Sequence, residues 1–330
     1  MNTPARELAR GRWHGILAQQ GIEDRFLSGN NVSCPFCGGK DRFRFTNHND
    51  EGWWHCNQCG SGDGFVFLEN LHGMDFKQCA SLVEEIVKLP SVEKMEQPKV
   101  DYGEREIRLR RRLQSSVEVT AGDPVYKYLK GRQLELPPNH DNRCRYVEKE
   151  PYYKDGGLLG YAPAMVWNIL TTDEKLMSAH ITYLTKDGGK LAVDKPKKMM
   201  PVCQPKRDDV SVIIPLSDMD ATGRLYITEG IENGLAVYKM TGGCVWAVIT
   251  AGGMERFTPP PQIKQLIICG DNDKSFTGQK SAYALAHRLQ MDDNIKAQIA
   301  VRIPDRAGID YNDELIEKSI KETFDKPATS

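Results

Sequence analysis

The sequence predicts a multidomain α/β protein, in which a small β-rich module is followed by an α+β region and by an α/β domain with a mainly parallel sheet. Two Cys-x-x-Cys pairs lie near the amino terminus, β-prone segments follow between residues 123 and 215, and strands and helices alternate regularly from residue 224 to 323. Such alternation is typical of a parallel sheet with helices on both faces. A chain of 330 residues is long enough for two or three domains with their own cores.

The composition is ordinary for a globular protein, with 40% hydrophobic and 27% charged residues. A net charge of −1 gives no overall basic signature, so any contact with nucleic acid has to come from local patches. No apolar run approaches the roughly 18 residues of a membrane span, and the amino terminus lacks the apolar core of a signal peptide. We therefore expect no membrane partner.

Nine cysteines are present, and five of them are scattered among apolar or helical neighbours: Cys79, Cys144, Cys203, Cys244 and Cys269. An odd number of dispersed thiols fits a reducing cytoplasm better than a disulfide framework. The remaining four form two pairs, Cys34-x-x-Cys37 and Cys56-x-x-Cys59, each followed by glycine. This spacing predicts a tetrahedral zinc ribbon with four thiolate ligands. His48 and His55 are not needed as ligands, because four sulfurs already fill the site.

The module around the cysteines is expected to contain a helix over residues 4–20 and a strand over residues 42–46. Aromatic side chains on and opposite this strand alternate with the exposed cations Lys40, Arg42 and Arg44. Cations interleaved with aromatic rings suit single-stranded nucleic acid, and we assign this role to the three cations and to Trp54. The alternative is that the two strand phenylalanines and one tryptophan form the core of the module, and for the phenylalanines this is the stronger interpretation.

The middle of the chain carries several weaker signals. Residues 64–89 predict one or two amphipathic helices, and residues 91–99 a linker. A helix over residues 101–113 holds five arginines, which would contact a nucleic-acid backbone, face solvent or clamp a neighbouring domain. A short helix over 124–130 precedes strands at 158–161, 164–170, 178–184 and 210–215. The basic run Lys195, Lys197 and Lys198 would bind phosphates or form a solvated loop.

In the last domain, acidic residues follow the predicted strands. The strand at 225–228 ends in Glu229, and the strand at 265–270 ends in Asp271 and Asp273. Further strands are expected at 244–250 and 297–303, with helices at 231–240, 278–289 and 312–323. Asp310 or Asp313 follows the last strand, and Asp310 is also placed to cap the final helix. The carboxyl ends of parallel strands meet at one edge of a sheet, so these acids should lie together.

Converging carboxylates repel one another, and a hard divalent cation relieves the repulsion. The edge therefore predicts a magnesium site, and magnesium suggests phosphate chemistry. For each acid alone, a surface position or a capped turn is the more economical interpretation. The three acids together favour the metal site.

The Glu-Gly after the first strand, the Asp-x-Asp after a later one and the subsequent Gly-x-Asp resemble the Toprim domain of bacterial DnaG-type primases, topoisomerases and some nucleases. The cysteine module resembles the zinc-binding domain of satellite-phage alpha-type primases. The resemblance covers residues ~10–70 and ~220–320 and implies four segments: a zinc-binding domain at 1–89, a linker and basic helix at 90–116, the amino-terminal subdomain of a primase core at 117–215 and a Toprim catalytic domain at 216–330.

The resemblance also implies roles for residues. Glu229 would be a general acid/base or orient a metal, and Asp271, Asp273 and Asp310 would bind catalytic Mg²⁺ or Mn²⁺, while Zn²⁺ is structural. The implied function is a DNA primase of a phage, plasmid or other mobile element in the cytoplasm of a bacterial host. It would make RNA primers from NTPs on single-stranded DNA, with a replicative helicase or initiator in trans, because no phosphate-binding Gly-x-x-x-x-Gly-Lys motif is present. The alternatives are a Toprim nuclease and a non-catalytic protein that binds single-stranded DNA.

Overall fold

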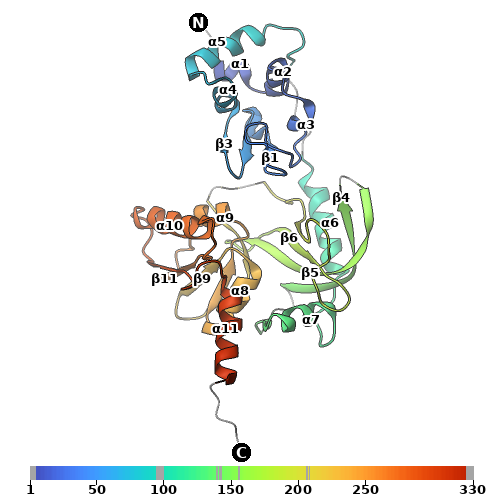
Figure 1. Cartoon of the computed structure of the whole chain (residues 1–330), viewed down its shortest axis with the longest axis vertical. Coiled ribbons are helices and arrows are strands. Elements are labelled where there is room, and N and C mark those ends of the chain that lie inside the picture. Colours follow the sequence, from blue (N-terminus) through green and yellow to red (C-terminus); the bar gives the residue numbers. More distant parts are fainter. Residues whose placement is uncertain are drawn as a thin grey trace, which may run out of the picture. The chain divides into compact units, whose positions relative to one another are not determined.

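The computed structural model describes residues 5–93, 100–138, 140, 143–154, 157–205, 207 and 209–324, with side chains up to residue 319. It divides the chain into two compact units, Met1–Val100 and Asp101–Ser330 (Figure 1). Most of the linker predicted at 91–99 lies outside the described residues.

Unit 1 surrounds a three-stranded antiparallel sheet of β1 (Phe43–Phe45), β2 (Trp54–Cys56) and β3 (Gly60–Gly62). Its helices are α1 (Ala5–Ala9), α2 (Trp13–Gln19), α3 (Asp24–Leu27), α4 (Gly64–His72) and α5 (Phe76–Ile86), with a 3-10 turn at His48–Asp50. The single helix predicted over 4–20 is wrong: Gly11, at φ 76°, separates α1 from α2. A left-handed backbone ends a right-handed helix and is readily adopted by glycine.

Unit 2 is built on one mixed sheet of nine strands. The strands are β4 (Cys144–Lys154), β5 (Gly157–Thr171), β6 (Leu176–Tyr183), β7 (Lys197–Met199), β8 (Val212–Pro215), β9 (Arg224–Thr228), β10 (Cys244–Ala247), β11 (Gln265–Cys269) and β12 (Gln298–Arg302). The helices are α6 (Tyr102–Gln114), α7 (Pro124–Gly131), α8 (Ile231–Thr241), α9 (Ala251–Arg256), α10 (Thr277–Gln290) and α11 (Tyr311–Phe324).

The strand order is β12-β11-β9-β10-β8-β5-β6-β7. Strand β4 pairs with β5 on the edge opposite β6, next to β8. Strands β12, β11, β9 and β10 are parallel, as predicted for the last domain. Strand β8 is antiparallel to both β10 and β5, so a single sheet continues from the α+β region into the last domain. Strand β4 and helix α9 were not predicted, and two predicted strands form the single strand β5.

Alternation along the parallel strands directs their side chains into two cores. On one face Tyr226 and Ile267 pack with Leu235 of α8 and Leu315 of α11. On the other face the neighbouring strand residues pack with α9 and α10: Leu225, Ile227, Leu266, Ile268, Met254, Ala282, Leu285 and Leu289. Strand β10 pairs with one edge of β9 and strand β11 with the other, so the order in which strands are added to the sheet reverses at β9. In such sheets ligands bind beyond the carboxyl ends of the strands at this point.

No helix among the described residues is long and apolar enough to cross a membrane.

Candidate functional site

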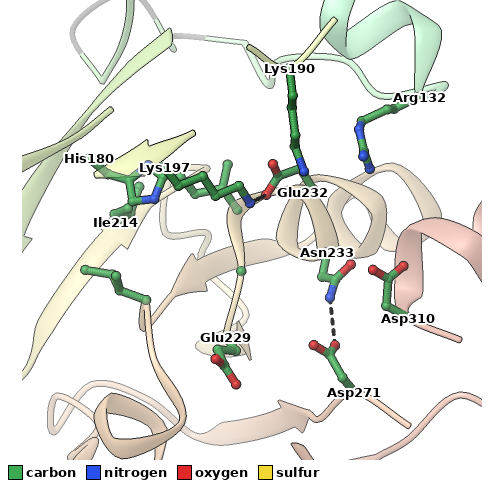
Figure 2. A pocket seen from close by; sticks show the side chains of 13 residues that line it. Arg132, His180, Lys190, Lys197, Ile214, Glu229, Glu232, Asn233, Asp271 and Asp310 are labelled. Atoms are coloured by element: carbon green, nitrogen blue, oxygen red, sulfur yellow. Dashed lines mark hydrogen bonds and ion pairs between the residues drawn. The ribbon is translucent and has the colours of Figure 1, made fainter. Parts of the chain in front are cut away.

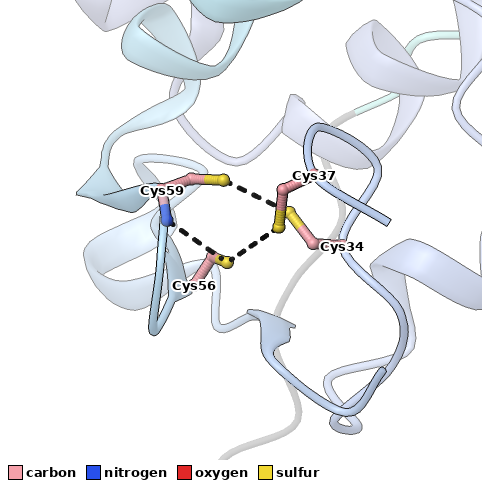
Figure 3. Close-up of side chains that lie close together, drawn as sticks. All are labelled: Cys34, Cys37, Cys56 and Cys59. Carbon is pink, nitrogen blue, oxygen red and sulfur yellow. Dashed lines mark hydrogen bonds between the residues drawn. The ribbon is translucent and has the colours of Figure 1, made fainter. Parts of the chain in front are cut away.

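The four paired cysteines converge on one point in unit 1 (Figure 3). Their sulfur atoms all lie within 4.8 Å of one another, with Cys34 Sγ 3.8 Å from Cys59 Sγ and Cys37 Sγ 3.9 Å from Cys56 Sγ. Zinc–sulfur bonds of about 2.3 Å in a tetrahedron place the sulfurs about 3.8 Å apart, which is the observed spacing.

Backbone amides stabilise these sulfurs as well. The amide of Phe36 donates to Cys34 Sγ at 3.4 Å, and that of Cys59 donates to Cys56 Sγ at 3.5 Å. Donors that point at a sulfur favour its thiolate form, which is the form that binds zinc. The donor set, its spacing and its amides fit a structural zinc ion.

The assignment of Trp54 to nucleic-acid binding is wrong. Its side chain is 1% exposed, its ring packs against Phe43 and Phe67, and its indole nitrogen donates to the carbonyl of Asp63. A ring covered on its faces cannot stack on a base. Phe43 and Phe45 are likewise buried, so the alternative interpretation of these aromatics as core is correct.

The three cations assigned with Trp54 are exposed. On β1, Arg44 points away from the core because its neighbours Phe43 and Phe45 point into it. It pairs across the sheet with His55, and Arg42 donates to the side-chain oxygen of Gln58. Lys40 lies in the turn after the first cysteine pair. The outer face of this small sheet is therefore polar and cationic.

In unit 2, the carboxyl ends of β9 and β11 open into a pocket of about 380 Å³ (Figure 2). Glu229, Asp271 and Asp310 form its acidic side, and Arg132, Lys190 and Lys197 its basic side. The apolar part of the lining comes from three isoleucines: Ile214, Ile231 and Ile249. The edge predicted from strand order is thus one wall of a cavity whose opposite wall belongs to the α+β region.

The carboxylates of this edge repel one another. Burial, together with the negative charges of Asp310 and Glu229, raises the pKa of Asp271 to about 7, against a hydrogen bond of 2.7 Å from Asn233. Burial also raises the pKa of Glu229, where the charge of Asp273 acts in the same direction. A cation placed between such groups would restore their ordinary acidity.

Asp273 does not line the pocket. Its carboxylate accepts hydrogen bonds from the amides of Thr277 and Gly278, at 3.1 and 2.9 Å, and from the hydroxyl of Ser275 at 2.7 Å. Burial alone would raise its pKa, but these donors lower it. Asp273 therefore holds the start of α10, as the alternative interpretation of a capped turn describes.

Asp310 both caps a helix and lines the pocket. One carboxylate oxygen accepts from the amide of Asp313 at 2.9 Å, which makes Asp310 the cap of α11, and the side chain also lines the pocket. The loop before it is attached to the Asp271–Asp273 loop by Asn272, which the sequence did not single out. The side-chain amide of Asn272 donates to the carbonyl of Pro304 at 2.7 Å.

We tested this edge as a divalent-cation site. Among the described residues, only the four cysteines have three or more ligand atoms within 4.8 Å of one another, so the acids do not converge at ligand distance. Their chemistry nevertheless fits Mg²⁺ or Mn²⁺, since carboxylates are the usual ligands and Mg²⁺ keeps several waters of its own. Asn233 adds a buried side-chain oxygen without a hydrogen-bond partner. Glu229, Asp271 and Asp310 would hold the cation, with Asp273 shaping the loop.

The basic wall is fixed by a buried carboxylate that the sequence did not reveal. Glu232, in the first turn of α8, accepts from Lys197 Nζ at 2.7 Å (Figure 2). It also accepts from the hydroxyl of Tyr128 at 2.7 Å. Burial alone would raise its pKa, but the charge and hydrogen bond of Lys197 lower it to about 2. Its position in the first turn of the helix that follows Glu229 is the signal that could have identified it.

The three lysines of the basic run lie in different places. Lys197 reaches the pocket, whereas Lys198, on the other face of β7, lies 3.7 Å from the ring centre of Tyr152 and donates to the carbonyl of Tyr153. Lys195 does not line the pocket either. Strand alternation explains the difference, because consecutive residues of a strand point to opposite faces. Only Lys197 can reach a ligand held at the acidic edge.

Three further residues that the sequence did not indicate complete this side of the pocket: Lys190, Arg132 and His180. Burial lowers the pKa of Lys190, and the charge of Lys197 lowers it further. Burial lowers the pKa of His180 to about 4, so its ring is neutral near pH 7. The cations Arg132, Lys190 and Lys197 therefore line one side of the pocket. They face the acids of the opposite side, Glu229, Asp271 and Asp310.

Models of known families match three stretches of the chain. The model of the Toprim domain matches residues 224–321, the stretch that contains the whole acidic edge. Residues 224–321 form a Toprim domain. The model of the zinc-binding domain of primase-helicase matches residues 29–65, and a domain of unknown function (DUF7146) matches residues 103–207. The resemblance to Toprim primases with a zinc-binding domain is therefore confirmed in both regions on which it was based.

Several solved structures are similar to this chain at low identity. The Aquifex aeolicus primase, with its zinc-binding and RNA polymerase domains, is 14% identical with a TM-score of 0.45, over 98% of this chain and 84% of its own. A DnaG primase catalytic domain bound to ssDNA is 15% identical with a TM-score of 0.44, over 68% and 78%. A DNA primase domain from Pseudomonas aeruginosa is 10% identical with a TM-score of 0.44, over 66% and 77%.

Proposed function

We propose that this protein is a DNA primase, which synthesises short RNA primers on single-stranded DNA from NTPs. The observation that carries the proposal is the pocket of the Toprim domain, in which an acidic edge faces a basic wall across about 380 Å³. An acidic wall that binds divalent cations and a basic wall that binds phosphates are the two requirements of nucleotidyl transfer.

In this proposal residues 1–89 form the zinc-binding domain, 90–116 a linker and basic helix, 117–215 the amino-terminal subdomain of the core and 216–330 the catalytic domain. The match of residues 29–65 to a primase-helicase zinc-binding domain supports a role in template binding. Lys40, Arg42 and Arg44 would contact the template backbone. A replicative helicase or initiator would be supplied in trans, and the setting would be a phage, plasmid or other mobile element.

The reaction joins a primer 3′-oxygen to the α-phosphorus of an NTP, while the bond from that phosphorus to pyrophosphate breaks. A bound Mg²⁺ or Mn²⁺ supplies charge neutralisation at the phosphates and acidifies the attacking hydroxyl. Glu229, which lines the pocket at the end of β9, would accept the hydroxyl proton. Lys190 and Arg132 would bind the triphosphate, and Glu232 would hold Lys197 against the same phosphates.

The test is de novo synthesis on unprimed single-stranded DNA of mixed sequence, with labelled NTPs and Mg²⁺ or Mn²⁺. Wild type should give short labelled products, and Asp271→Ala combined with Asp273→Ala should give none. Asp293→Ala, which removes an exposed acid beyond α10, is the matched control and should keep full activity. Cys56→Ser tests whether the zinc ribbon is needed for template use.

The products distinguish the alternatives. Template cleavage that requires the acids, without labelled products, would indicate a Toprim nuclease. Absence of both reactions, with DNA binding that survives the loss of the acids, would indicate a non-catalytic DNA-binding protein. Either result contradicts the primase proposal.

A further inference from the structure

Phe276 occupies an unusual position at the edge of the catalytic domain. It lies between Asp273 and α10, its backbone is left-handed at φ 60° and ψ 16°, and its side chain is 69% exposed. A bulky residue in the left-handed region is a genuine outlier, and glycine adopts this conformation without strain. An exposed phenylalanine therefore combines an unfavourable backbone with an unburied ring.

Packing does not explain the ring, because the turn is held by polar groups. The amide of Phe276 donates to the carbonyl of Asp273 at 3.1 Å, and the Asp273 carboxylate accepts from Thr277 and Gly278. The side chain of Gln279 donates to the carbonyl of Asp273 and to the side-chain oxygen of Asn272. These contacts use the main chain at Phe276 and leave its ring to solvent. Strained residues of this kind cluster at ligand-binding sites.

The ring begins an exposed stripe along α10. Lys280, Tyr283 and His287 follow at helical spacing, and Tyr283 is 59% exposed. The Lys280 side chain is 75% exposed, and its Nζ lies 3.3 Å from Oε1 of Glu255 in a surface ion pair. The opposite face of the helix packs into the core through Ala282 and Leu285. Lys274 is exposed on the other side of Phe276. The stripe thus alternates cation and ring: Lys274, Phe276, Lys280 and Tyr283.

We propose that this stripe binds single-stranded nucleic acid, with Phe276 stacked on an unpaired base next to the acidic edge. Aromatic faces interleaved with cations match bases and phosphates, whereas an aliphatic protein partner would gain nothing from the lysines. Phe276 and Tyr283 are seven residues apart, about 10 Å along a helix, or roughly three stacked bases at about 3.4 Å each. Phe276 is five residues from Asp271, whose side chain lines the pocket, so a strand bound along the stripe would begin on the loop that leaves the acidic edge.

That the bound strand leads toward the acids rests on the proposed function, but the test of binding needs no catalysis. Binding of a labelled oligo-dT is measured by fluorescence anisotropy with the full chain, without NTPs. Phe276→Ala and Phe276→Gly should each weaken binding about five- to tenfold, and Phe276→Trp should retain it. Met291→Ala, which removes an equally exposed apolar side chain at the far end of α10, should leave binding unchanged.

Phe276→Gly separates binding from folding. Because glycine accepts a positive φ, its melting temperature should equal or exceed that of wild type while its affinity falls. A purely structural role for Phe276 would instead lower the melting temperature of both small variants. A 5-iodouracil-substituted oligonucleotide should cross-link under ultraviolet light to the tryptic peptide Ser275–Lys280.

Three results overturn the inference. They are wild-type affinity in Phe276→Ala, a cross-link confined to peptides outside residues 275–288, and weakening by Met291→Ala as large as by Phe276→Ala. The first two leave the primase proposal intact if primers are still made. A wild-type chain that neither binds oligo-dT nor makes primers overturns both.

Discussion

The zinc site of unit 1 and the proposed magnesium site of unit 2 differ in how closely their ligands converge. The cysteines of unit 1 converge within 4.8 Å and match the spacing around zinc, whereas the acids of unit 2 do not reach ligand distance. Each Cys-x-x-Cys turn fixes two ligands through its own backbone, so only two turns need to meet. The acids come from three separate segments after β9, β11 and β12, and their charges oppose convergence.

The difference teaches where each metal contributes. Thiols are neutral without metal and lose their protons as zinc binds, so such a site can fold together with its ion. A site of like charges on a sheet is held by other elements, and burial together with the remaining repulsion raises the pKa of Asp271 to about 7. Zinc should therefore determine stability, and magnesium activity.

The largest effect should come from zinc. Chelation, or Cys56→Ser, should unfold unit 1, because the free energy of structural zinc binding, on the order of 10 kcal/mol, is folding free energy. Zinc content and thermal unfolding of the full chain measure this. Cys79→Ala, which truncates a buried thiol outside the site, should retain zinc. Unchanged unfolding after complete zinc loss would show that the core around Trp54 suffices by itself.

The next largest effects should come from the two acids of the Asp-x-Asp motif, and they should differ between Asp271 and Asp273. Asp271→Asn and Asp273→Ala should both reduce primer synthesis, by about a hundredfold or more for Asp271, whose carboxylate lies in the pocket. Their effects on stability should differ in sign. Asp273→Ala removes the cap of α10 and should cost about 1 kcal/mol, while Asp271→Asn removes repulsion and should raise the melting temperature without metal. Urea unfolding checks both, and equal destabilisation would contradict the division of roles.

The pH dependence of stability should sharpen this contrast. Asp271 has a folded pKa of about 7, above the ordinary value of about 3.9. The stability that its protonated form gives the folded state is therefore present below about pH 4 and is lost as the pH rises from about 4 to about 7. Glu232 has a folded pKa of about 2, so its contribution is present above about pH 4 and lost as the pH falls toward 2. Saturating Mg²⁺ should abolish the first dependence and leave the second. Melting curves between pH 2 and 8 measure both, with Asp271→Asn as the control.

Patterns local in sequence predicted much of this. Most helices and strands in residues 224–323 were predicted to within one residue at each end, although helix α9 was missed and the strand predicted at 244–250 ends at Ala247. The zinc ligands followed from their spacing alone. The edge that holds Glu229, Asp271 and Asp310 followed from strand order, because parallel strands end together.

Contacts distant in sequence were not predictable in this way. The basic wall brings Arg132, Lys190 and Lys197 together from separate segments, and Lys197 pairs with Glu232. No local pattern indicates which lysine meets which acid. Trp54 was misassigned because composition cannot distinguish an exposed ring from a buried one. Strand β4 was missed because its residues, from Cys144 to Lys154, mix charged and aromatic side chains without a clean alternation.

The smallest expected effect concerns how unit 1 holds nucleic acid. Arg44→Ala removes one exposed cation from β1 without touching the zinc site or the core. If Arg44 contacts a phosphate, affinity for single-stranded DNA should fall about two- to threefold for every sequence, and the slope of log affinity against log salt should fall by about 0.7. Lys88→Ala, at the exposed end of α5, is the charge-matched control and should change neither. Because Phe276→Ala removes a ring rather than a charge, it should weaken binding without altering that slope. Equal salt slopes in wild type and Arg44→Ala would remove the outer face of the ribbon from the binding surface and leave unit 2 to hold the strand.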